Sequence, residues 1–153
     1  MEDLPLYNSR IISTYLKFIR RNYSYVDVGE LLSYAGMEPY QVEDEGHWFR
    51  QDQIDRFYER IVRVTNNPGI AREAGRYSAS PDTSGLVRQY ALGFVGPAKV
   101  YEMIGKTARN FVRSSRFDAV RVGPNRVEIT VTPNEGVTEK RFQCENRIGY
   151  FEA

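Results

Sequence analysis

Up to about residue 113, apolar residues recur every three or four positions, which is the spacing of amphipathic helices packed on a common core. In the first helix they form one stripe from Ile11 to Ile19, behind Asn8 or Ser9 as N-cap. A second, short helix starts at Asp27, where an acidic residue suits the cap, and Gly36 is a natural stop. The predicted helices span about 8–21, 27–35, one turn from 39, 51–65, 68–77, 84–94 and 97–113.

After Ser115 the period of the pattern changes to two. Residues 117–122 are typical of one strand, and residues 127–132 alternate apolar and polar side chains, as a strand with one solvated face does. Turn residues at 123–125 and 133–136 separate these strands from a third at about 137–145. The predicted fold class is therefore α+β: N-terminal helices followed by a three-stranded antiparallel meander packed on them.

The chain has the length of one ordinary domain, 153 residues. It stops on the largely apolar stretch 148–153, whereas native domain ends are usually more polar. We therefore expect residues 1–153 to be a single domain truncated from a longer protein.

Charge and hydropathy limit the partners and the location. The formal net charge of +1 gives no general attraction for nucleic acid or for an anionic membrane, so neither is expected as a partner. No apolar run approaches the length that crosses a bilayer, and the acidic N-terminus has no signal-peptide core. These features predict a cytoplasmic domain.

The inventory of reactive side chains is small, with one histidine, His47, and one cysteine, Cys144. His47 could be an axial haem ligand, but a loop histidine beside Trp48 is the favoured interpretation, because no apolar cleft is indicated around it. Cys144 lies late in the predicted third strand, with no base linked to it. The sequence predicts no catalytic residue, no metal site, no cofactor and no enzymatic activity in this segment.

Aromatic residues are unusually frequent, with 11 tyrosines, eight phenylalanines and one tryptophan. Tyrosines crowd the first forty residues, which suits a dimer face, an aromatic-lined ligand pocket or ordinary boundary packing. If a pocket exists, the burial pattern of the last two helices, with Trp48 near the mouth, predicts these ligand-binding residues: Trp48, Tyr90, Phe94, Tyr101, Ile104 and Phe111.

Several short motifs resemble a family of bacterial sensory domains. The stretch 31–39 (LLSYAGMEP) is similar to their leucine-rich helix followed by Gly, an apolar residue and Pro, and 64–71 (VTNNPGIA) is similar to their Thr-Gly-Asp-Pro junction. Residues 72–77 (REAGRY) and 144–153 (CENRIGYFEA) continue the likeness, the latter resembling the start of their second half. Such domains stand at the N-terminus of sensor histidine kinases and nucleotide cyclases. They are similar in fold to haem–nitric-oxide-binding domains, to 4-vinyl-reductase-like sensors and to a Golgi-transport subunit.

The resemblance implies an N-terminal signal-input domain of a bacterial histidine kinase or related signalling protein of two-component type. Such a domain would bind a small apolar or aromatic ligand or a partner, form a homodimer and act on an output domain in the same chain. Haem is not carried over, because no residue matches a haem-ligand motif. Two alternatives remain: a dimerisation or scaffold module without ligand, and the ligand-binding half of an AraC-type transcription regulator.

Overall fold

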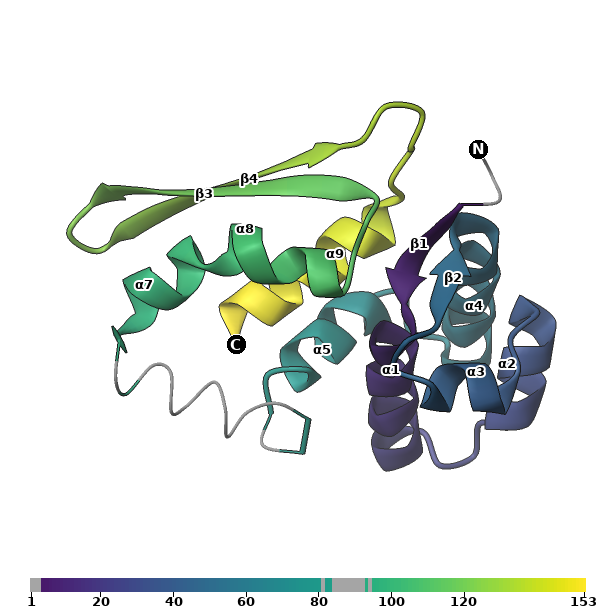
Figure 1. Cartoon of the computed structure of the whole chain (residues 1–153). Coiled ribbons are helices and arrows are strands. Elements are labelled where there is room, and N and C mark those ends of the chain that lie inside the picture. Colours follow the sequence, from purple (N-terminus) through teal and green to yellow (C-terminus); the bar gives the residue numbers. More distant parts are fainter. Residues whose placement is uncertain (1–3, 81, 84–92, 94) are drawn as a thin grey trace.

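The computed structural model describes residues 4–80, 82–83, 93 and 95–153. The predicted helix at 84–94 lies almost wholly outside these residues. The observed class is α+β, mostly helical with short antiparallel strands. Figure 1 shows helices α1 to α4 gathered on one side and a long hairpin, β3–β4, extending over α7, α8 and α9 on the other.

The N-terminal helices confirm the predictions from spacing. They are α1 (Ser9–Asn22), α2 (Val28–Ala35), α3 (Pro39–Glu43), α4 (Gln51–Thr65) and α5 (Ile70–Tyr77). The Asn8 side chain caps α1 by accepting a hydrogen bond from the Arg10 amide, and Asp27 caps α2 in the same way through Glu30. Gly36 ends α2 with a φ of 69°, a left-handed conformation that glycine adopts without strain.

Two short strands were not predicted. β1 (Pro5–Asn8) leads directly into α1, and β2 (Trp48–Arg50) leads directly into α4. They pair antiparallel, with Tyr7 opposite Phe49 and Asn8 opposite Trp48. Strands of three or four residues are too short to give a periodic signal. Because the pair is antiparallel, the start of α1 lies beside the start of β2, where the Ser9 amide donates to the carbonyl oxygen of His47.

The predicted meander is corrected to a two-stranded hairpin. β3 (Ser115–Gly123) pairs antiparallel with β4 (Arg126–Pro133), so the first two predicted strands are confirmed. The third is wrong, because residues from Arg141 onward form the helix α9 (Arg141–Glu152). In a strand, Val137 and Phe142 would point to opposite faces, because they are an odd number of residues apart. In the helix α9, Phe142 and Asn146 lie one turn apart and share one face.

The helix predicted for residues 97–113 is interrupted. It consists of α7 (Pro97–Glu102), α8 (Ile104–Thr107) and the 3-10 turn η1 (Ala108–Asn110). Gly105 has low helix propensity, and a Cβ atom at this position would lie 2.7 Å from the carbonyl oxygen of Phe117. The missing side chain therefore allows α8 to approach β3 closely.

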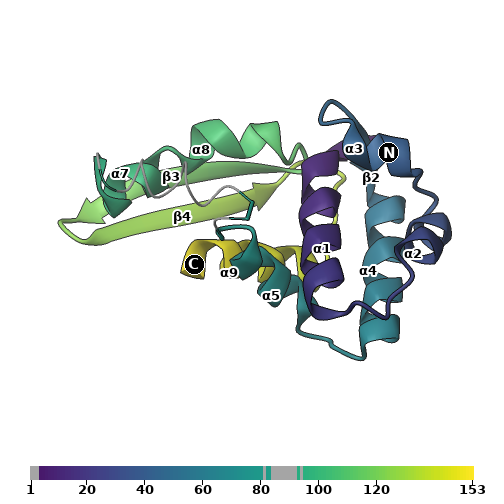
Figure 2. The ribbon, with the colours of Figure 1, turned by 90° about the horizontal axis from the view of Figure 1, so that it is seen from below.

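The core lies in the N-terminal half. Apart from Ile104, the buried hydrophobic residues of the described chain all fall between Leu6 and Ala74. Figure 2 shows α5 and α9 side by side, with α1 and α4 beyond them. Among the described helices, none combines the length and the apolar character needed to cross a membrane.

Candidate ligand cavity

A cavity of about 490 Å³ lies where α1, α4, α5, α8, β3 and α9 converge. Its size falls within the range of small-molecule sites in proteins. Its wall is mostly apolar and aromatic: Ile12, Phe57, Ile104, Phe111, Phe117, Phe142 and Phe151. Two ring contacts hold parts of this wall in place. The rings of Tyr15 and Phe57 meet edge-on with their centroids 5.6 Å apart, and the rings of Tyr58 and Phe142 stack with their centroids 4.1 Å apart.

Tyr15, on α1, brings an unsatisfied polar atom to this wall. Its side chain is buried, with 5% of the residue exposed, and its hydroxyl has no hydrogen-bond partner among the described residues. Burial, with a smaller contribution from Tyr58, raises the pKa of the Tyr15 hydroxyl above its ordinary range. The hydroxyl therefore stays protonated, and as a neutral O–H group it is both a donor and an acceptor.

Arg147, on α9, brings a second unsatisfied group. Its Nη2 donates to Glu139 Oε2 at 2.5 Å, and its guanidinium lies 5.2 Å from the Phe117 ring centroid. The other terminal nitrogen, Nη1, is buried and has no partner among the described residues. An arginine carries five N–H donors, so engaging one side of the guanidinium leaves the other side available.

Glu139 holds Arg147 in place. The Glu139 carboxylate accepts hydrogen bonds from Ser114 Oγ at 3.0 Å and from Ser115 Oγ at 2.5 Å, in addition to Arg147. Burial by itself would raise the pKa of Glu139. The hydrogen bonds from Ser115 and Arg147 and the charge of Arg147 outweigh that effect, so the pKa is lowered and the carboxylate is ionised. Its three hydrogen-bonding partners thus come from two separate elements, β3 with the residue before it, and α9.

Helix α9 is clamped against α5. Asn146 Nδ2 donates to the carbonyl oxygen of Ala71 at 2.8 Å. Near the end of α9, Glu152 accepts hydrogen bonds from Arg72 and Arg76, which lower the pKa of its carboxyl group to about 2. The helix that carries Arg147 is therefore held on α5 by several polar contacts along its length.

The sequence-predicted ligand residues are divided between several places. Ile104 and Phe111 line the cavity. Tyr101 lies outside it and donates its hydroxyl to the carbonyl oxygen of Phe151 at 2.7 Å. Trp48 also lies outside it, on β2, with the Arg113 guanidinium 3.6 Å from its ring centroid. Tyr90 and Phe94 lie outside the described residues, and the ligand-binding role of the whole set stays a prediction.

Two important side chains were not among the predicted ligand residues. Tyr15 belongs to both the apolar stripe and the tyrosine-rich first forty residues, but only the structure distinguishes its unsatisfied hydroxyl from that of Tyr7, which donates to Gln51. Arg147 gave no sequence signal, because the segment before it was interpreted as a strand.

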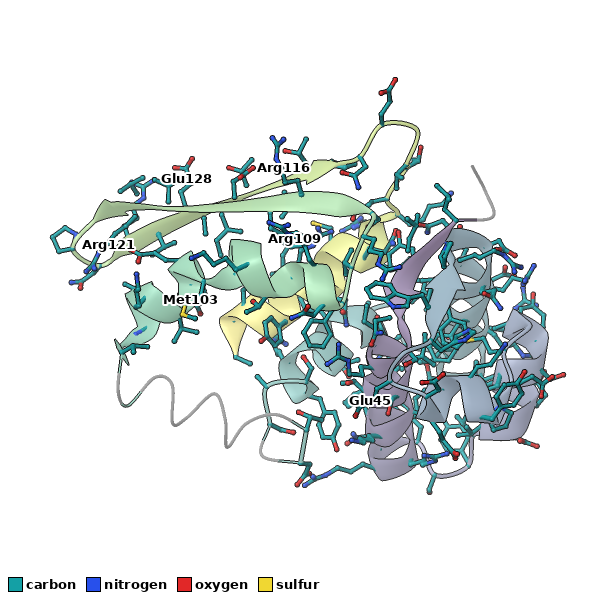
Figure 3. All side chains as sticks on the ribbon, in the orientation of Figure 1. Glu45, Met103, Arg109, Arg116, Arg121 and Glu128 are labelled. Carbon is teal, nitrogen blue, oxygen red and sulfur yellow. The ribbon has the colours of Figure 1, made fainter. Side chains whose placement is uncertain are left out.

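At the edge of the cavity, Glu45 lies against the start of α1. Its carbonyl oxygen accepts a hydrogen bond from Asn8 Nδ2 at 2.9 Å (Figure 3).

The fold has counterparts among solved structures, although neither a family model nor a curated protein sequence matches this chain. One similar structure comes from work on modulating haem redox potential through protein-induced porphyrin distortion; it has a TM-score of 0.67 and 22% identity, covering 95% of this chain and 82% of the other. Another comes from work probing the function of haem distortion in the H-NOX family; it has a TM-score of 0.62 and 20% identity, covering 95% and 77%. The fold of this chain is H-NOX-like.

The cavity of this H-NOX-like chain does not fit a haem. Protein haem irons are held by histidine, cysteine, methionine or tyrosinate. The single histidine, His47, lies outside the cavity with its ring against Phe49, and the single cysteine, Cys144, is exposed. Neither of the described methionines, Met37 and Met103, lines the cavity.

Three tyrosines of the described wall are poor candidates for the missing ligand. Burial raises the pKa of Tyr7, Tyr15 and Tyr58, which opposes formation of a tyrosinate. The described residues also contain no group of histidine, cysteine and acidic side chains that could hold a metal ion. Within the described residues, the donor set of this cavity does not fit a haem iron.

Proposed function

We propose that this chain is a signal-input domain that senses a small organic molecule in its cavity without using haem. The observation that carries the proposal is a mostly apolar cavity of about 490 Å³ whose wall contains two buried, unpartnered polar groups, on Tyr15 and Arg147. Apolar walls with a few placed polar groups are the usual composition of a small-molecule site. An unsatisfied buried polar group costs stability, so a ligand that satisfies it gains affinity for that reason.

Helix α9 is the element through which binding would be communicated. It contributes Phe142, Asn146 and Arg147 to the cavity wall and rests on α5 through a close helix contact. A ligand that favours one packing of α9 on α5 over another would shift the population of the two. We propose that this shift biases an output domain, and the sequence resemblance supports a histidine kinase or related bacterial signalling protein in the cytoplasm.

The structures with the same fold support the sensory role. One of them comes from work on the H-NOX family, whose name refers to haem, and both come from work on haem distortion. We propose that this chain keeps the sensory architecture with a different ligand. Nothing in the described site assembles a nucleophile, base and orienting group, so we also propose that this segment is not an enzyme.

Thermal-shift screening of the purified chain against a library of small apolar and aromatic compounds tests this proposal. We expect at least one compound to raise the Tm of the wild type in proportion to its concentration. In the variant A108F, which fills the cavity from its own wall, the shift should disappear, whereas in V120F, on the exposed part of β3, it should persist. The absence of any stabilising compound, or equal shifts in wild type and A108F, would overturn the proposal.

A dimerisation module is the second candidate, and exposed tyrosines favour it. Tyr7, on β1, and Tyr15, on α1, are buried, so neither is presented to a partner. Tyr25, Tyr34 and Tyr40, which lie near α2 and α3, are exposed. Light scattering across a wide concentration range tests this candidate, and a strict monomer would exclude it.

A further inference from the structure

We infer that the cavity selects a neutral apolar molecule bearing a carbonyl-type acceptor, which hydrogen-bonds to Nη1 of Arg147. This inference rests on the proposed function and specifies its ligand. The starting point is the asymmetry of the guanidinium: Nη2 is engaged by Glu139 at 2.5 Å, while Nη1 is buried without a partner among the described residues. A buried donor on a charged group is among the most costly to leave unsatisfied.

The donor belongs to a rigidly held group. The Arg147 side chain is 14% exposed and that of Glu139 is 12% exposed. Glu139 is itself fixed by hydroxyl groups of Ser114 and Ser115, and the guanidinium lies against the Phe117 ring. The guanidinium thus keeps its orientation when a ligand arrives, which favours binding, and a small shift of the side chains that cover Nη1 exposes the donor to the ligand.

The local charge decides between a neutral and an anionic ligand. Arg147 is already neutralised by the ionised Glu139, so a ligand carboxylate would add an uncompensated negative charge beside an existing one. A buried charge without its own partner is strongly unfavourable. A ketone, amide or ester oxygen accepts the same charge-assisted hydrogen bond without that penalty.

The remaining charges of the wall do not change this conclusion. The described wall contains three cationic side chains, Arg10, Lys17 and Arg147, and three carboxylates, Glu43, Glu45 and Glu139. Lys17, Glu43 and Glu45 are exposed, and Arg10 donates to Asn8 and to the carbonyl oxygen of Asn110. No excess positive charge is therefore left to attract an anion.

The body of the ligand is set by the rest of the wall. Phe117, Phe142 and Phe57 surround the space with aromatic rings, and aromatic ligands pack well against such rings. Tyr15, on α1, provides a second unpartnered group in the same wall. Its neutral hydroxyl makes a weaker hydrogen bond than a guanidinium, so Arg147 should dominate the selection.

Three matched probes test the inference: 2-acetylnaphthalene, 2-naphthoate and 2-ethylnaphthalene, titrated into the full chain by calorimetry. They share a ring system and differ in carrying a ketone, a carboxylate or neither. We expect the ketone to bind about tenfold more tightly than the hydrocarbon, because it satisfies the buried donor. It should also bind more tightly than the carboxylate at pH 7.

Two variants assign the effect to a residue. R147K retains a cation for Glu139 and removes the second nitrogen, so the preference for the ketone over the hydrocarbon should be lost while the hydrocarbon still binds. Y15F should keep the preference. Loss of the preference in Y15F but not in R147K, or tighter binding of 2-naphthoate in the wild type, would overturn the inference.

The outcomes separate this inference from the function on which it rests. If the hydrocarbon and the ketone bind equally, the cavity takes ligands but Arg147 does not select them, and only the inference fails. If none of the three probes binds and the compound screen also finds nothing, the sensory proposal itself fails.

Discussion

Gly149 of α9 lies so close to Arg72 of α5 that a Cβ atom at this glycine would stand 2.1 Å from the Arg72 carbonyl oxygen. The relationship is reciprocal along the crossing, since a Cβ at Gly75 would stand 2.0 Å from the carbonyl oxygen of Asn146. Both distances are far shorter than real Cβ contacts, and both involve backbone atoms that a side-chain movement does not relieve. The two glycines therefore set the separation of α5 and α9.

Replacement of Gly149 by alanine should force these helices apart. We expect G149A to lower the free energy of unfolding by about 3 kcal/mol or more, the upper end of the usual cost of overpacking, because backbone must shift. Urea denaturation followed by circular dichroism measures the change. The control is G93A, since no described atom lies within 4 Å of a Cβ at Gly93 and alanine should be neutral or stabilise by roughly 0.5–1 kcal/mol. Equal stability of G149A and wild type would contradict the close crossing.

Removal of the Tyr15 hydroxyl should behave unlike most core substitutions. In Y15F an unsatisfied buried polar group is lost and the ring remains, so the ligand-free protein should gain about 1 kcal/mol. Y7F is the matched control, because the hydroxyl of the equally buried Tyr7 donates to Gln51, and its loss should cost about 1 kcal/mol. Chemical denaturation of both variants measures these two opposite changes in the free energy of unfolding. A similar loss in both would show that Tyr15 has a partner.

Stability should depend on the ionisation of Glu139. The folded-state pKa of this carboxyl is lowered, so its contribution is fully present above the ordinary glutamate pKa and is lost as the pH falls through the lower, folded-state value. Near neutral pH, E139Q should be less stable than wild type by about 3 kcal/mol, because Arg147 loses its buried counter-charge. The difference should shrink as the pH falls from 5 toward 2.

Denaturation curves of wild type and E139Q at several pH values measure how their difference in the free energy of unfolding decreases as the pH falls. E128Q is the control, at an exposed position on β4 that Figure 3 shows on the hairpin. This variant should follow the wild type at every pH. A difference that has already vanished at pH 5, above the ordinary glutamate pKa, would count against a lowered pKa.

The single tryptophan should report on the contact between β2 and the segment that precedes β3. The Arg113 guanidinium lies 3.6 Å from the Trp48 ring centroid, a cation–π arrangement. R113M removes the charge, so we expect a changed emission intensity or maximum and a stability loss of about 0.5–1 kcal/mol. R121M, at the turn end of the hairpin (Figure 3), is the control and should leave the emission unaltered. Identical spectra for R113M and wild type would refute the contact.

The sequence predicted the helical half well because local signals there agree with the tertiary packing. Asn8, Asp27 and Gly36 supply caps at the positions where the helices begin and end, and the apolar stripe of α4 is continuous over the whole helix. The first two strands of the C-terminal part were found for the same reason, since alternation from Val127 to Thr132 is unbroken.

The errors arose where tertiary contacts override local pattern. The conformation of α9 depends on its crossing with α5 at Gly75 and Gly149, two residues that carry no apolar side chain and so leave no periodic signal. The candidate site was only partly predictable for a related reason. Ile104 and Phe111 stand out as apolar positions, whereas the significance of Arg147 depends on Glu139, Ser114 and Ser115 meeting it from other segments.

The uneven distribution of buried residues has a consequence for amide hydrogen exchange. Nearly all the buried hydrophobic residues of the described chain lie before residue 75, whereas β3 and β4 carry largely exposed side chains, Val120 and Val122 among them. Amides in α1 and α4 should therefore exchange only through global unfolding. Those of the hairpin should exchange through a sub-global opening that requires less free energy. We expect such an opening to separate Phe117 from α9 and to give a small molecule a route to the interior while the rest of the domain stays folded.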